Sequence, residues 1–178
     1  MDSREQSQWL TNHIPHRVRA GVALLDGMEK SLLGAKIIIA PTCQSAEESL
    51  YWRIVTNSVF EGRLAATRWL IEFVGINQDR NGVPCNREKS KNHPFDVRIE
   101  DLDGGEILKC DTDDGKYLAD IWKGCSQASG HATHKSNHPS VADRRIAAAL
   151  TIIRVHLQKT IYTKAGLNIR DCVFNRSL

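Results

Sequence analysis

Motifs of several common enzyme classes are missing from this sequence. It contains no GxGxxG or Walker phosphate loop, no G-x-S-x-G and no H-E-x-x-H. Their absence lowers the expectation of a nucleotide-loop enzyme, an α/β hydrolase or a zincin protease. No motif in the chain therefore identifies a reaction.

Long apolar runs and paired cysteines are missing as well. No window approaches the roughly 18 consecutive apolar residues that a membrane span requires, and the first ten residues, MDSREQSQWL, lack the apolar core of a secretion signal. The five cysteines are an odd number and include no C-x-x-C, which argues against a disulfide framework. We expect a soluble, cytoplasmic protein with reduced thiols and no membrane partner.

Length and composition are those of an ordinary globular domain. The chain has 178 residues, of which 41% are hydrophobic and 25% are charged, so neither disorder nor a fibrous class is indicated. The formal net charge of +3 is mildly basic. It permits a nucleic-acid or phosphate partner without requiring one.

Apolar residues recur at intervals of three and four in four segments, the spacing that lines one face of a helix. These segments run from about Pro15 to Leu33, from Ser45 to Gly75, from Thr112 to Cys125 and from Ser140 to Thr163. Pro15 fits the first turn of a helix, where its missing N–H is not needed. Gly62, in the middle of the second helix, is interpreted as a point of close packing. Shorter helices are predicted within residues 3–12 and in the last dozen residues.

The chain between the second and third helices has a different pattern. Residues 77–94 are polar and lack a period, which indicates an exposed loop. Apolar and polar residues alternate over 95–99, turn residues follow at 103–105, and the extended pattern resumes over 106–110. We predict a small β-hairpin there, within an insertion that spans about 77–112.

Together these elements predict a single helical domain over residues 1–178. The fold class is mainly all-α, with an up-and-down, four-helix bundle-like core and a small inserted β-hairpin. An amphipathic bundle of this kind often pairs a remaining apolar face, so we expect a homo-oligomer, most simply a homodimer. The up-and-down path also divides the histidines into two groups at opposite ends of the bundle.

The first group combines histidine with arginine. The position of His156 along the last helix places it, with Arg154, at the end that carries His16, Arg17 and Arg19. Arginine forks bind phosphate oxygens, and histidine transfers protons near neutral pH. We predict binding of RNA or another phosphate-bearing partner through Arg17, Arg19 and Arg154, with His156 and His16 as catalytic residues. For His156 the alternative is a hydrogen-bonded histidine beside the core.

The second group lies in the loop from 125 to 138. His131, His134 and His138 are spaced at three and four residues, with Cys125 and Cys43 within plausible reach. Imidazole and thiolate are ligands that zinc prefers, so the loop could hold zinc or another transition metal in a hydrolase-like site. In the alternative interpretation, His131 and His134 cap the preceding helix and Cys125 is a small core residue.

A third hypothesis assigns no catalytic activity to the chain. The chain is then a non-catalytic interaction or structural module, and replacement of every histidine leaves its function intact.

Overall fold

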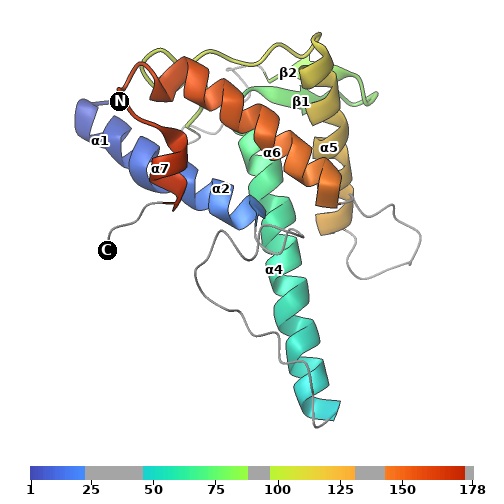
Figure 1. Ribbon diagram of the computed structural model, residues 1–178. Coiled ribbons are helices and arrows are strands. Elements are labelled where there is room, and N and C mark those ends of the chain that lie inside the picture. Colours follow the sequence, from blue (N-terminus) through green and yellow to red (C-terminus); the bar gives the residue numbers. More distant parts are fainter. Residues whose placement is uncertain (23–45, 88–96, 131–142, 175–178) are drawn as a thin grey trace.

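The computed structural model describes residues 1–22, 46–87, 97–130 and 143–174 (Figure 1). This part of the chain is mostly helical and contains a small antiparallel sheet, which confirms the mainly helical class. The up-and-down four-helix bundle stays a prediction. The helices are α1 (Ser3–Gln8), α2 (Ile14–Val22), α4 (Ala46–Phe73), α5 (Asp113–Gly130), α6 (Asp143–Leu157) and α7 (Ile169–Phe174).

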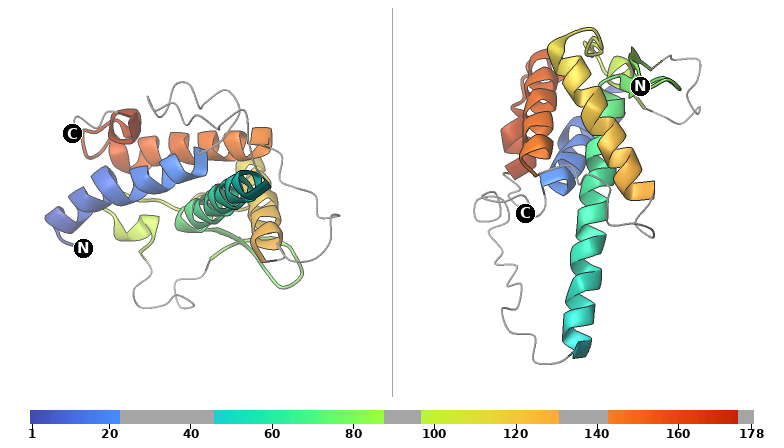
Figure 2. Two further views of the ribbon diagram at one scale, coloured as in Figure 1. Left: turned by 90° about the horizontal axis from the view of Figure 1, so that it is seen from below. Right: turned by 90° about the vertical axis from the view of Figure 1, so that its right-hand side faces the viewer.

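Helix α4 is the central element. It packs mainly against α2 and α5, while α6 contacts α2, α4 and α5. In Figure 1 the first half of α4 projects beyond the other helices, and the view from below in Figure 2 shows α4 nearly end-on with α5 and α6 passing beside it. The second half of α4 is therefore the part that organises the core.

The predicted apolar stripes form the core. One buried cluster joins residues from every long helix: Ile14, Val18, Leu64, Leu70, Ile71, Leu118, Ile121, Ile146, Leu150, Ile153, Leu157 and Ile161. All of these side chains are at most 5% exposed. The helical period read from the sequence therefore identifies the buried faces of the described helices.

The first helical run begins earlier in the chain than the predicted start at Pro15. Helix α1, the π-helical turn η1 (Trp9–His13) and α2 follow one another without a break. The predicted short helix within residues 3–12 is therefore confirmed, but Pro15 lies inside a continuous helical run, not at a free first turn. The predicted extension to Leu33 lies outside the described residues beyond Val22.

The π turn explains how the run passes through proline. The Ile14 N–H donates to the Trp9 carbonyl, five residues back. In this register the Leu10 carbonyl would need an N–H from Pro15, which has none. The hydroxyl of Tyr162 donates to that carbonyl at 2.7 Å instead. Tyr162 is completely buried and belongs to a second π-helical turn, η4 (Gln158–Tyr162).

Close packing occurs at a different glycine from the one expected. Gly62 is exposed, and no atom lies within 4 Å of the position that a Cβ would take, so its interpretation as a packing point is wrong. At Gly21 a Cβ would lie 3.1 Å from Leu150 Cδ2 and 3.5 Å from Thr67 Oγ1. Gly21 is thus where α2 approaches α6 and α4.

The sheet lies inside the predicted insertion but not at the predicted strands. Strands β1 (Ile76–Gln78) and β2 (Pro84–Asn86) pair antiparallel within the stretch expected to be a loop. Their turn is closed by Asp79, whose Oδ1 accepts from the N–H groups of Asn81 and Val83, both at 2.8 Å. Gly82 adopts a φ of 79° there. Local turn chemistry, which has no period, therefore specifies this hairpin.

The predicted hairpin over 95–110 is wrong for its described residues. A 3-10 turn, η3 (Ile99–Asp101), forms here instead, and Asp101 Oδ2 accepts from the N–H of its capping residue Arg98 at 2.9 Å. The chain from 105 to 109 is irregular and is held by Asn86, whose Nδ2 donates to the Leu108 carbonyl at 2.7 Å. Within the described part of this segment, Ile99 inserts into the core, where it is 0% exposed.

Local contacts mark the ends of the later helices. Thr112 Oγ1 accepts from the Gly115 N–H at 3.1 Å at the start of α5, and Gly166 follows η4 with a φ of 68°. Helix α7 is the predicted short terminal helix. None of the described helices is long and apolar enough to cross a membrane.

Candidate functional site

One candidate site is an aromatic and cationic cluster between η1, α2 and α4, which we call the α2 surface: Trp9, His13, Arg17 and Trp69. The ring centroids of Trp9 and His13 lie 4.8 Å apart, and those of Trp9 and Trp69 lie 6.1 Å apart in a stacked arrangement. The guanidinium of Arg17 lies 5.3 Å from the centroid of the Trp69 ring. His13 and Arg17 are exposed, and both tryptophans are half-buried.

Helix geometry produces this cluster. Trp9, His13 and Arg17 follow one another at intervals of four, which places them on one face of the helical run. Trp9 stacks on Phe73, at 6.1 Å, whereas Gly21 lies against Thr67, so α2 and α4 run in opposite directions. Phe73 is 3% exposed and anchors the stack to the core.

The predicted binding residues of α2 have different environments. Arg17 forms no ion pair within the described ranges, so its charge remains available beside the Trp69 ring. His16 is exposed on the same helix. Arg19 is half-buried, and its Nε donates to the Pro15 carbonyl at 3.2 Å. Arg17 is therefore the better placed of the two arginines to meet a ligand.

His156 makes a structural contact. Its Nε2 lies 2.6 Å from the carbonyl oxygen of Glu106, so this nitrogen carries the proton and donates. The bond ties α6 to the irregular segment over 105–109. This agrees with the alternative of a hydrogen-bonded histidine, while the predicted catalytic role of His156 stays a prediction.

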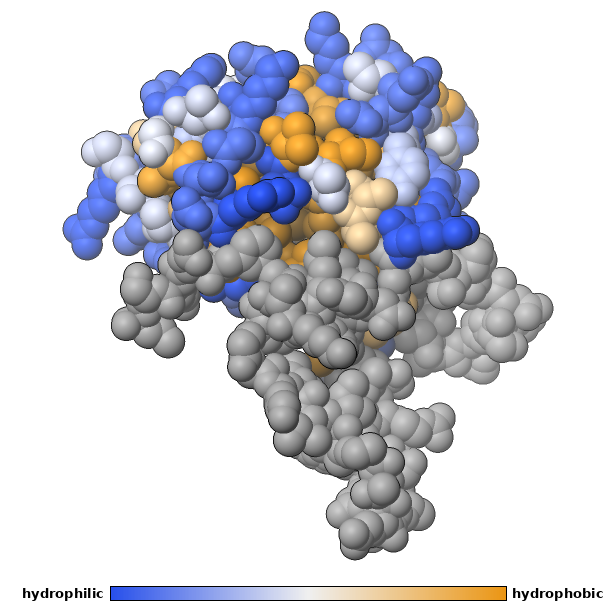
Figure 3. All heavy atoms as spheres, viewed as in Figure 1, coloured by the Kyte–Doolittle hydropathy of each residue, from blue (hydrophilic) through white to orange (hydrophobic). Residues whose placement is uncertain are grey.

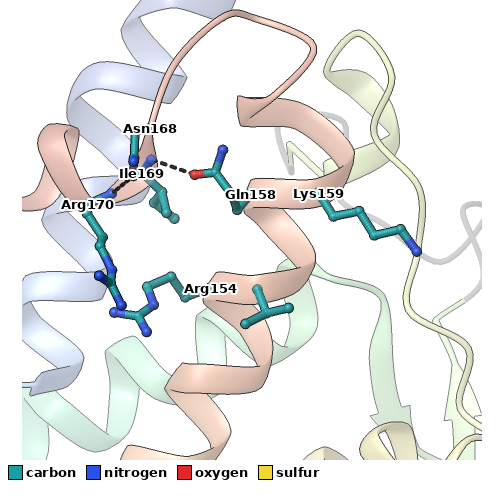
Figure 4. Close-up of a pocket in the computed structure, with 7 residues that line it drawn as sticks. Arg154, Gln158, Lys159, Asn168, Ile169 and Arg170 are labelled. Carbon is teal, nitrogen blue, oxygen red and sulfur yellow. Dashed lines mark hydrogen bonds between the residues drawn. The ribbon is translucent and has the colours of Figure 1, made fainter.

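Arg154 belongs to a second candidate site, a pocket of about 440 Å³ between α6 and α7, which we call the α6–α7 pocket. It is lined by Arg154, Val155, Gln158, Lys159, Asn168, Ile169 and Arg170. Figure 4 shows the guanidinium groups of Arg154 and Arg170 extending toward each other, while Lys159 points away from them.

Hydrogen bonds fix the wall of this pocket. Gln158 Oε1 accepts from the Ile169 N–H at 2.8 Å, and its Nε2 donates to the Leu167 carbonyl at 3.1 Å. Asn168 Oδ1 accepts from the Arg170 N–H at 2.9 Å. Gln158 thus holds the start of α7 against η4 and sets the position from which Arg170 extends.

Two other arginines are already paired with a carboxylate. Arg68 Nε donates to Glu72 Oε1 at 2.9 Å, and Arg87 lies 3.5 Å from Glu72 Oε2. The Trp122 Nε1–H also donates to Glu72, at 2.7 Å. These contacts join α4, the residue that follows β2, and α5, so this cluster is a structural connection.

The predicted metal ligands His131, His134 and His138 lie outside the described residues, and their role stays a prediction. Residues that the structure does describe include no group of three or more histidine, cysteine or acidic side chains able to hold a metal ion. Cys125 is 0% exposed, and burial raises the pKa of its thiol to about 11. Cys125 therefore stays protonated near neutral pH and packs as a core residue.

Sequence reasoning missed the aromatic half of the α2 surface and the α7 side of the pocket. Trp9 and Trp69 are far apart in the sequence. The four-residue spacing of Trp9, His13 and Arg17 could have drawn attention to Trp9, but no pattern points to Trp69. Arg170 meets Arg154 across the turn at Gly166, and no sequence pattern predicts this contact between the two elements.

Figure 3 shows apolar side chains between hydrophilic ones on the face over which α6 runs, and Val155 of α6 is 59% exposed. Self-association stays a prediction, as does a cytoplasmic location. Comparison of the chain with protein-family models, with curated proteins and with solved structures finds no match.

Proposed function

We propose that the chain binds single-stranded RNA at the α2 surface. The observation that carries the proposal is the exposed guanidinium of Arg17 over the half-buried ring of Trp69, next to exposed His13 on Trp9. Proteins bind single strands by stacking bases on aromatic rings and on guanidinium planes. The α2 surface offers both kinds of plane side by side.

Charge supports the same partner. Arg4, His16 and Arg17 are exposed on the first helical run. None of the three forms an ion pair with another described residue, so these side chains can contact phosphates without breaking such an ion pair. Each phosphate contact releases counterions, which makes such binding weaker at high salt.

The α2 surface is tested by anisotropy of a short labelled single-stranded RNA, titrated with the protein at several salt concentrations. Loss of a stacking side chain typically costs about 1–3 kcal/mol per base, so Arg17→Ala should weaken binding about 5- to 150-fold. Arg17→Lys keeps the charge but loses the planar group, so it should restore only part of the affinity. The matched control is Arg144→Ala, an exposed arginine on α6.

Equal affinity of the wild-type protein and Arg17→Ala would remove the proposal. An equal loss in Arg144→Ala would show that binding follows total charge and not the α2 surface. Cleavage of RNA by His16 and His156 stays a separate prediction. It requires that bound RNA yields shorter products and that His16→Ala, which replaces an exposed side chain, abolishes them.

A further inference from the structure

Two arginines from different elements converge in the α6–α7 pocket. Arg154 comes from α6 and Arg170 from α7, and their guanidinium groups extend toward each other (Figure 4). Neither takes part in an ion pair among the described residues. Like charges held close together repel, and an anion between them relieves that repulsion.

We propose that this pocket binds a small phosphate ester. Two guanidinium forks directed at one point can donate several charge-assisted hydrogen bonds to a phosphate group. The proposal is independent of RNA binding at the α2 surface, because none of the pocket residues belongs to that surface.

The size of the pocket suits a small molecule. Its volume of about 440 Å³ is within the range of small-molecule sites. Val155, which is 59% exposed, adds apolar surface beside the arginines. The ligand should therefore combine a phosphate dianion with an apolar or aromatic group.

Hydrogen bonds preorganise the pocket for a ligand. Gln158 uses its amide on the Ile169 N–H, the Leu167 carbonyl and Thr163 Oγ1. Asn168 accepts from the Arg170 N–H. Because α7 is fixed to η4 in this way, little ordering of the backbone is needed when a ligand binds.

Isothermal titration with phenyl phosphate tests the proposal on the full chain. One equivalent should bind, more tightly than inorganic phosphate, because only phenyl phosphate reaches the apolar lining. Arg154→Gln and Arg170→Gln should each weaken binding at least tenfold. Arg144→Gln removes the same charge from the same helix, about 15 Å from Arg154 along the axis, and should bind as the wild-type protein does.

The two arginine variants replace side chains that form no ion pair with a described residue, so their thermal unfolding should match that of the wild-type protein. Unchanged affinity in both variants, or an equal loss in Arg144→Gln, would overturn the proposal. Competition by single-stranded RNA, with loss of RNA binding in Arg154→Gln, would show that the pocket takes RNA phosphates and would also overturn it. Failure of Arg17→Ala to affect RNA binding concerns only the α2 surface.

Discussion

The bond between Tyr162 and the Leu10 carbonyl allows a prediction to be worked out in detail. Tyr162→Phe removes a buried hydroxyl and leaves the Leu10 carbonyl without its partner, because Pro15 has no N–H to offer it. An unsatisfied buried polar group costs about 1–3 kcal/mol. We therefore expect Tyr162→Phe to lower the free energy of unfolding by about 1–3 kcal/mol.

The Pro15→Ala background tests the cause of this loss. An alanine at position 15 supplies an N–H, so the Leu10 carbonyl can be satisfied within the helix whether the turn keeps its π register or becomes α-helical. Tyr162→Phe should then cost at least about 1 kcal/mol less than in the wild-type background, which is a coupling that a double-mutant cycle resolves.

Urea unfolding followed by circular dichroism measures the four proteins of this cycle. A cost of Tyr162→Phe that is the same in both backgrounds would refute the reasoning. It would mean that the hydroxyl is important for packing alone and that the missing N–H of Pro15 does not create its role.

Three further predictions concern other parts of the fold. Gly62→Ala should raise the free energy of unfolding by up to about 1 kcal/mol through helix propensity. Gly21→Ala should lower it by about 1–3 kcal/mol, because the new Cβ would lie 3.1 Å from Leu150 Cδ2. Thermal unfolding of both variants checks this, and equal shifts would contradict it. Burial raises the pKa of Cys125 to about 11 from 9.0, so the folded state favours the thiol; this stability is complete below pH 9 and is lost as the pH rises toward 11, by about 2–3 kcal/mol. Urea unfolding across that range should show a smaller fall in Cys125→Ala, and identical pH profiles would argue against a buried thiol. His156→Ala should speed amide hydrogen exchange in residues 105–109, because their bond to α6 is lost, and unchanged exchange there would show that the bond contributes nothing.

The helices could be predicted from the sequence because their apolar period is long and continuous. Ile146, Leu150, Ile153 and Leu157 repeat over a full helix, and each is buried as expected. Caps such as Thr112 act through neighbours three residues away, so they too can be read locally. Such signals depend little on the rest of the fold.

The hairpin and the candidate sites could not be placed in this way. The β1–β2 turn depends on Asp79 accepting two backbone N–H groups, a contact that hydrophobic alternation does not report. The two sites depend on tertiary contacts, since Trp69 meets Arg17 across two helices and Arg170 meets Arg154 across a turn. The positions of arginine and histidine in the sequence therefore identified helices that carry the sites, but not the side chains that these residues contact.

Ultraviolet cross-linking of single-stranded RNA to the wild-type protein, followed by mass spectrometry of the digested peptides, tests the proposed function most directly. Stacking on the α2 surface predicts that cross-linked nucleotides are found on the peptides that contain Trp9 or Trp69, and that Arg17→Ala strongly reduces both. Cross-links confined to other peptides would contradict the account. The absence of any cross-link would contradict it as well, provided that the wild-type protein and Arg144→Ala are both fully folded.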